Sequence, residues 1–96
     1  MAVHPVIRRN PHTAWRAVGP YTVLVPLDRL DGEVANNTLV LQGTGPVLWE
    51  WLSTPRSEAE LAERLTQEFA VDLERAQRDV RRFVERLLEL KALEPS

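Results

Sequence analysis

The chain has 96 residues, of which 44% are hydrophobic and 27% charged, and its formal net charge is −2. This length suits one folded domain and is too short for two. The absence of cysteine excludes disulfides, thiolate metal sites and cysteine nucleophiles. A domain that binds nucleic acid through its phosphates is usually basic, so the charge argues against DNA binding. No signal-peptide core is present and no apolar run approaches the ~20 residues of a membrane span, so we expect a cytoplasmic location.

The first half of the chain predicts a small antiparallel sheet. Residues 1–12 are expected to form an extended N-terminal arm, followed by a single domain at residues 13–96. Gly19 and Pro20 mark a turn between the first two strands. Runs of β-branched and aromatic residues predict three strands, at residues 13–18, 21–25 and 33–41.

A Gly-Thr-Gly-Pro corner at residues 43–46 predicts that the third strand leads directly into a helix over residues 46–52. The two glycines relax the backbone at this corner. Thr44 is expected to cap the new helix, and Pro46 suits its first turn.

The second half predicts two further helices, because the apolar period changes from two to 3.6. Ser57 opens the second helix, and Glu60 three residues later predicts a capping box. Asp72 is the expected N-cap of the third helix, over residues 73–90. The side chains expected to be buried are Leu61, Leu65 and Phe69 in the second helix and Ala76, Val80, Phe83, Leu87 and Leu90 in the third. The fold class is therefore α+β: a three-stranded antiparallel sheet followed by three helices in a helix-turn-helix layout.

The residue inventory offers no catalytic group. His4 and His12 are the only histidines, and no carboxylate lies beside them at metal-ligand spacing. The serines lack a Gly-x-Ser-x-Gly elbow, and no phosphate-binding glycine loop is present. We therefore expect a protein that is not an enzyme and that holds neither a metal nor a cofactor.

Three tryptophans are many for a domain of this size. Trp49 and Trp51 are two residues apart and so point about 200° from each other on a helix. We expect one in the core and one packed under the sheet or the arm. The alternative is that one of them lines a peptide-binding cleft.

The expected third helix carries four arginines at helical spacing: Arg75, Arg78, Arg82 and Arg86. Acidic residues lie between them, so pairs such as Arg75–Asp79 and Arg82–Glu85 are available. The stripe is therefore either a solvent face of ion pairs or a charged wall for an acidic partner. Exposed pairs contribute only tenths of a kcal/mol, so a better ligand could displace them.

Four segments of the chain stand out together by their order and spacing. They are Arg9-Asn10-Pro11 before Trp15-Arg16, Leu41-x-Gly43-Thr44-Gly45-x-x-Leu48-Trp49-x-x-Leu52, Ser57-x-x-Glu60-Leu61-x-x-x-Leu65 ending at Phe69, and Asp79-Val80-x-x-Phe83-Val84-x-x-Leu87. In this order they resemble the PqqD-like family, the small peptide-chaperone domains also called RiPP recognition elements. The likeness covers about residues 8–94. Many members carry Leu-Asn before the first helix and Gly-Leu after the last, where this chain has residues 39–41 and Lys91-Ala92-Leu93.

The resemblance implies a winged helix-turn-helix-like fold that binds the leader region of a ribosomally synthesised precursor peptide. It also implies a partner enzyme, such as a radical SAM protein, a cyclase or a protease, and no nucleic acid or membrane. The peptide would add as a strand to the open edge of the third strand and lie against the third helix. The residues expected to bind it are Thr38, Leu39, Val40, Leu41, Gln42, Arg75, Asp79, Arg82 and Arg86.

Two other functions remain open at this stage. The arginine stripe favours a winged-helix DNA-binding regulator. The overall acidity disfavours one, as does a second helix with a single basic residue, Arg64. The third possibility is that this chain is a structural subunit of a larger enzyme. Such a subunit would co-purify with the enzyme in the absence of a leader peptide.

Overall fold

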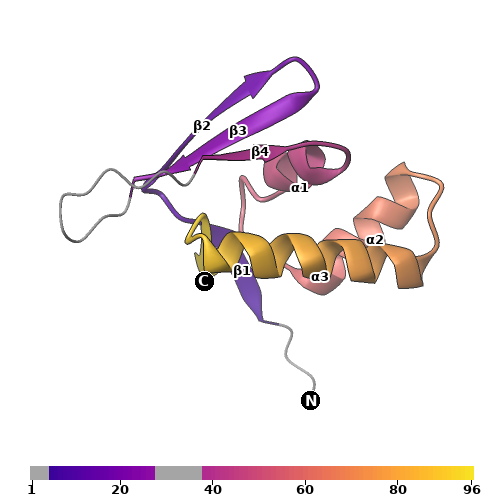
Figure 1. The fold of residues 1–96 in the computed structure, drawn as a ribbon. Coiled ribbons are helices and arrows are strands. Elements are labelled where there is room, and N and C mark those ends of the chain that lie inside the picture. Colours follow the sequence, from indigo (N-terminus) through magenta and orange to yellow (C-terminus); the bar gives the residue numbers. More distant parts are fainter. Residues whose placement is uncertain (1–4, 28–37) are drawn as a thin grey trace.

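Two small antiparallel sheets and three helices make up the part of the chain that the computed structural model describes, residues 5–27 and 38–96. One sheet has the strand order β2-β3-β4, and the other has the order β5-β1-β6. Figure 1 shows the β2-β3-β4 sheet above α1 and α3. The predicted α+β class is confirmed. The elements are β1 Val6–Arg9, β2 Thr13–Val18, β3 Tyr21–Pro26, β4 Leu39–Leu41, α1 Gly45–Trp51, β5 Arg56–Ser57, α2 Glu58–Glu68, α3 Leu73–Glu89 and β6 Leu93–Pro95.

The β2-β3 hairpin is built on the Gly19-Pro20 turn, as predicted. Gly19 has a φ of 58°, a left-handed conformation that glycine adopts without a Cβ clash. Glycine at the first central position of a two-residue loop is typical of the type II′ turn, whose twist matches that of the strands. β3 then pairs with β4, which confirms the three-stranded sheet. Of the predicted third strand, residues 33–37 lie outside the described residues.

The N-terminal segment differs from the expected unpacked arm. Residues 6–9 form β1, the central strand of the second sheet, between β5 and β6. The Ile7 side chain is only 5% exposed and belongs to the core. Its partners are strands of two and three residues that lie far along the chain. Strands this short have no local sequence pattern that predicts them, so the sequence analysis does not expect β1, β5 or β6.

The helix at the Gly-Thr-Gly-Pro corner forms, but Thr44 does not cap it. Thr44 occupies the N-cap position with φ −83° and ψ −8°, and its side chain makes no capping hydrogen bond. A side-chain cap normally needs an extended N-cap backbone, and this residue is already helical. The corner requires glycine at position 45 for a packing reason: a Cβ there would lie only 3.1 Å from Cβ of Leu41. Pro46 lies in the first turn, as predicted.

Both later helices begin where their caps predict. The Ser57 hydroxyl accepts from the backbone N–H of Glu60 at 3.2 Å, and the Glu60 carboxylate accepts from the Ser57 N–H at 3.2 Å. Asp72 accepts from the Arg75 N–H at 2.8 Å. The predicted burial of Phe69 is wrong, since its side chain is 39% exposed. α2 ends at Glu68, and the extended backbone of Phe69 takes its side chain off the helical stripe.

A Schellman motif ends α3 and leads into β6. The Ala92 N–H donates to the Leu87 carbonyl at 2.9 Å, and the Lys91 N–H donates to the Leu88 carbonyl at 3.1 Å. Lys91 has a φ of 63°, a conformation that usually selects glycine. The buried Asn10 fastens this turn to the chain after β1, because its side-chain amide donates to the Lys91 carbonyl at 2.8 Å.

The core fills the space between the β2-β3-β4 sheet and the helices. One face of that sheet contributes Leu24, Leu39 and Leu41. Most of the predicted helical stripes are confirmed: Leu61, Leu65, Ala76, Val80 and Leu87 are buried, and Phe83 and Leu90 are partly buried. The helices also bury Leu48, Trp49 and Val84. No helix within the described residues has the length and apolar character needed to cross a membrane.

Candidate functional site: the groove between β4 and α3

β4 is an edge strand with one open side. It pairs only with β3 among the described residues, so its other side carries backbone groups without a partner strand. An open edge of this kind is a template for another extended chain.

The hairpin register decides which groups face the open side. Val18 and Tyr21 flank a two-residue turn and therefore exchange backbone hydrogen bonds. Hydrogen-bonded pairs alternate along a ladder, so the backbone groups of Thr22 and Leu24 point toward β4. Their partners there are Leu41 and Leu39. The N–H and C=O of Val40, which lies between those two, consequently point away from β3 and into the open side.

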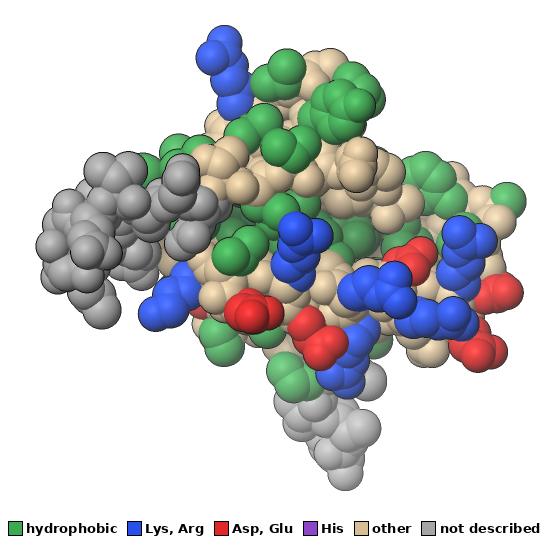
Figure 2. All heavy atoms as spheres, in the orientation of Figure 1, with side chains coloured by type: hydrophobic (Ala, Val, Ile, Leu, Met, Phe, Trp, Pro, Cys, Tyr) green, Lys and Arg blue, Asp and Glu red, His purple; other side chains and the backbone are tan. Residues whose placement is uncertain are grey.

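A groove of about 230 Å³ lies between this edge and α3. Its apolar lining includes Leu48 of α1 and Phe83 and Leu87 of α3, and Arg82 and Arg86 supply positive charge. Figure 2 shows charged side chains along α3, below the hydrophobic side chains of the sheet. The lining residues are Leu39, Val40, Leu41, Gln42, Thr44, Gly45, Leu48, Asp79, Arg82, Phe83, Arg86 and Leu87.

The model of the family described as coenzyme PQQ synthesis protein D (PqqD) matches residues 21–93 of this chain. This chain belongs to the PqqD family. The matched range begins at β3 and ends in β6, so it includes both walls of the groove. No curated protein sequence matches the chain.

Two solved structures are similar to this PqqD-family chain. One is titled "TbiB1 in Complex with the TbiA(beta) Leader Peptide". It has a TM-score of 0.76 and 21% identity over 91% of this chain and 94% of that one. The other is titled "Lasso peptide synthetase B1 complexed with the leader peptide". It has a TM-score of 0.70 and 25% identity over 93% of this chain and 98% of that one. The fold is therefore shared along nearly the whole length.

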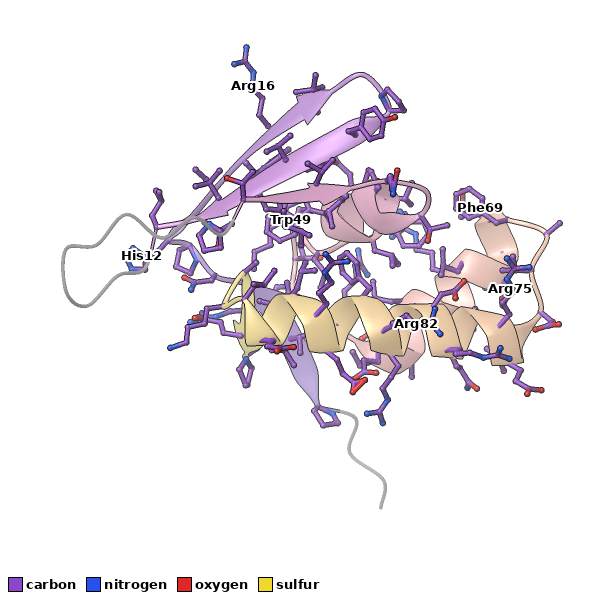
Figure 3. All side chains as sticks on the ribbon, in the orientation of Figure 1. His12, Arg16, Trp49, Phe69, Arg75 and Arg82 are labelled. Atoms are coloured by element: carbon purple, nitrogen blue, oxygen red, sulfur yellow. The ribbon has the colours of Figure 1, made fainter. Side chains whose placement is uncertain are left out.

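The groove brings together most of the residues that the sequence predicted for the site. Leu39, Val40, Leu41 and Gln42 lie on one wall and Asp79, Arg82 and Arg86 on the other. Thr38 directly precedes β4 and Arg75 lies nearer the start of α3, and neither lines the groove. Figure 3 shows Arg75 and Arg82 at different points along α3. The sequence analysis does not place Leu48, Phe83 or Leu87 in the site, because apolar residues at helical spacing also fit core packing.

The arginines of α3 divide into paired and unpaired ones. Arg75 lies 3.9 Å from Asp79, and Arg78 lies 3.9 Å from Glu74. Within residues 5–27 and 38–96, neither Arg82 nor Arg86 forms an ion pair, so the available Arg82–Glu85 pair is not made. The two arginines beside the groove are therefore the ones whose charge is not matched by a neighbouring side chain in the described structure.

The tryptophans support the fold and do not line this groove. Trp49 is 1% exposed, which confirms one tryptophan in the core. The Arg9 guanidinium lies 4.9 and 4.7 Å from the ring centroids of Trp15 and Trp49, which pack edge-on against each other, and its Nε donates to the Trp49 carbonyl at 3.0 Å. Burial lowers the pKa of the Arg9 guanidinium, and the Glu50 carboxylate opposes that change. Trp51 is partly buried against the core, and the Arg64 guanidinium lies over its ring, 4.7 Å from the centroid.

The part of the chain that the structure describes holds no cluster of metal ligands at His12. His4 lies outside the described residues, and His12 follows β1 in the turn before β2 (Figure 3). No group of three or more histidine, aspartate or glutamate side chains that could hold a metal ion occurs in the described part of the chain.

Proposed function

We propose that this chain binds the leader region of a ribosomally synthesised precursor peptide and presents it to a modifying enzyme without catalysing a reaction itself. The observation that carries the proposal is the groove: an open strand edge faces a charged helix across an apolar floor. An extended peptide would add to β4 and take its main-chain hydrogen bonds from Val40 and the neighbouring positions.

The groove also suits such a peptide chemically. Alternate side chains of an added strand point to the same face, so every second residue of the peptide would enter the groove. The lining by Leu48, Phe83 and Leu87 favours an apolar or aromatic side chain. Arg82 and Arg86 favour an acidic residue beside it, since charge-assisted hydrogen bonds to a guanidinium are strong.

The two similar structures support the same function. Each was solved as a complex with a leader peptide, according to its title. Because of its family and its shared fold, we expect this chain to bind a leader peptide. A protease, a cyclase or a radical SAM protein remains the proposed class of partner enzyme, and the cytoplasm remains the proposed location.

DNA binding is the weaker alternative. In a helix-turn-helix protein a positive helix enters the major groove. Here Arg75 and Arg78 are paired with carboxylates on the same helix, and the chain is acidic overall. A structural subunit of a larger enzyme is also disfavoured, because such a role would not require an open strand edge beside a groove.

A titration separates these functions. Synthetic peptides that cover the first half of each short open reading frame beside this gene serve as probes, with a duplex DNA in the same buffer at moderate salt. We expect saturable calorimetric binding of one peptide and no binding of the duplex. Duplex binding without any peptide binding would reject the proposal.

A further inference from the structure

The outer face of the β2-β3-β4 sheet, which points away from the helices, is apolar and uncovered in the described structure. Val18, Tyr21 and Val40 are 51%, 42% and 52% exposed. Residues opposite each other in the register share a face, so Val23 lies on this face beside Val40. Figure 2 shows hydrophobic side chains gathered over the upper part of the molecule, where this sheet lies. Apolar side chains grouped in this way on a soluble domain mark an interaction surface.

This outer face is hollowed as well as apolar. A shallow depression of about 320 Å³ lies over β2 and β3, and its walls are mostly valine and alanine side chains. A flat sheet face without a depression would offer little shape for recognition. The residues that line it are Ala14, Trp15, Arg16, Val18, Val23 and Val25.

One charge marks this face. Arg16 is the only charged residue in β2, β3 and β4, and Figure 3 shows its side chain pointing away from the helices. A second copy packed face to face would bring two such arginines into one apolar interface, where like charges are costly. A different protein with a carboxylate opposite Arg16 has no such cost.

Val40 joins this face to the groove. Its backbone N–H and C=O point into the open side of β4, while its side chain lies on the outer face beside Val23. A strand added to β4 continues the pleat, so the side chains of the peptide that do not enter the groove extend the outer face. The outer face is therefore completed by the bound peptide.

We propose that the outer face of the β2-β3-β4 sheet is the docking surface for the enzyme that modifies the bound precursor. That enzyme presents apolar side chains around a carboxylate that pairs with Arg16. This inference rests on the proposed function, and it adds a recognition mechanism: the enzyme contacts the sheet and the peptide together, so it binds the loaded chain more tightly than the free one.

Two variants test the surface while preserving the strands. Arg16→Glu reverses the charge, and the double variant Val18→Thr/Tyr21→Thr removes apolar surface with residues that favour β-structure. Arg81→Glu is the matched control, because Arg81 is an exposed arginine of α3 that pairs with Glu58 away from this sheet. The probes are the purified modifying enzyme encoded beside this gene and the leader peptide that binds the wild-type chain.

Leader affinity is measured by calorimetry, and enzyme affinity by interferometry on the immobilised chain with and without leader. We expect each test variant to bind the enzyme at least tenfold more weakly than wild type and to bind the leader peptide within twofold of wild type. The control variant Arg81→Glu should bind both as wild type does. Circular dichroism verifies that each variant is folded. Enzyme affinity that is equal in wild type and both variants would overturn the proposal.

The remaining outcomes separate this inference from the proposed function. Enzyme binding that depends on Arg16 although no leader binds would keep the docking surface and reject the leader-binding function. A dimer of the wild-type chain in sedimentation, lost in Val18→Thr/Tyr21→Thr while enzyme binding persists, would overturn the proposal and assign the face to a second copy.

Discussion

The two three-stranded sheets of this domain differ in how they are assembled. The β2-β3-β4 sheet comes from one stretch of chain and leaves the far side of β4 open. The β5-β1-β6 sheet joins three distant segments around the buried Ile7. The second sheet pairs β1 with β6 and so joins segments from opposite ends of the fold. The first sheet presents an open edge and an exposed face. Four substitutions test this division of roles.

The largest effect is expected in the β5-β1-β6 sheet. Ile7→Ala should lower the free energy of unfolding by about 2–4 kcal/mol, because it removes buried methyl groups and leaves a cavity. Urea unfolding measures this value. Leader affinity of the folded variant should stay within twofold of wild type. A loss of stability below about 1 kcal/mol would show that β1 is peripheral, as the sequence had suggested.

A substitution at the open edge of β4 should lower leader affinity rather than stability. Val40→Pro removes the outward N–H and leaves the ladder to β3 intact, so leader affinity should fall at least about tenfold, or 1.4 kcal/mol. Stability should change less than in Ile7→Ala. Val40→Thr keeps the N–H and is the matched control in the same calorimetric titration. Equal affinity of a folded Val40→Pro variant and wild type would place the binding surface elsewhere.

Arg82 tests the helical wall of the groove. Arg82→Glu should lower the affinity for an acidic leader peptide severalfold at low salt. The effect should shrink as the salt concentration rises, because exposed charges are screened. Arg78→Glu is the control, since Arg78 pairs with Glu74 and does not line the groove. If both reversals weaken binding equally, the effect reflects net charge rather than a contact in the groove.

Lys91 tests the turn that joins α3 to β6. Lys91→Gly should raise the free energy of unfolding by about 0.5–1 kcal/mol, because glycine adopts a φ of 63° without a Cβ clash. Lys91→Ala should give no such gain, since alanine keeps the clash. Chemical unfolding of the two variants side by side measures the difference. A similar gain in both would attribute the effect to the lost charge.

The contrast between the sheets also explains what the sequence could predict. The Gly19-Pro20 turn, the Ser57 capping box and the Asp72 cap are local signals, and each marked its element correctly. β1 has no local signal, because its partners are short and distant. Within the groove, the polar and strand positions were predictable from the family resemblance. Phe83 was not, since a partly buried residue on an apolar stripe has the same spacing whether it lines a groove or fills a core.

Amide hydrogen exchange across β4 tests the central claim most directly. In the free chain, the N–H groups of Leu39 and Leu41 point toward β3 and should exchange slowly, whereas the Val40 N–H should exchange quickly. Saturation with the leader peptide should slow exchange at Val40 by at least about tenfold, because its N–H then donates to the added strand. Unchanged exchange at Val40 in a chain that is demonstrably saturated with leader would contradict strand addition at this edge.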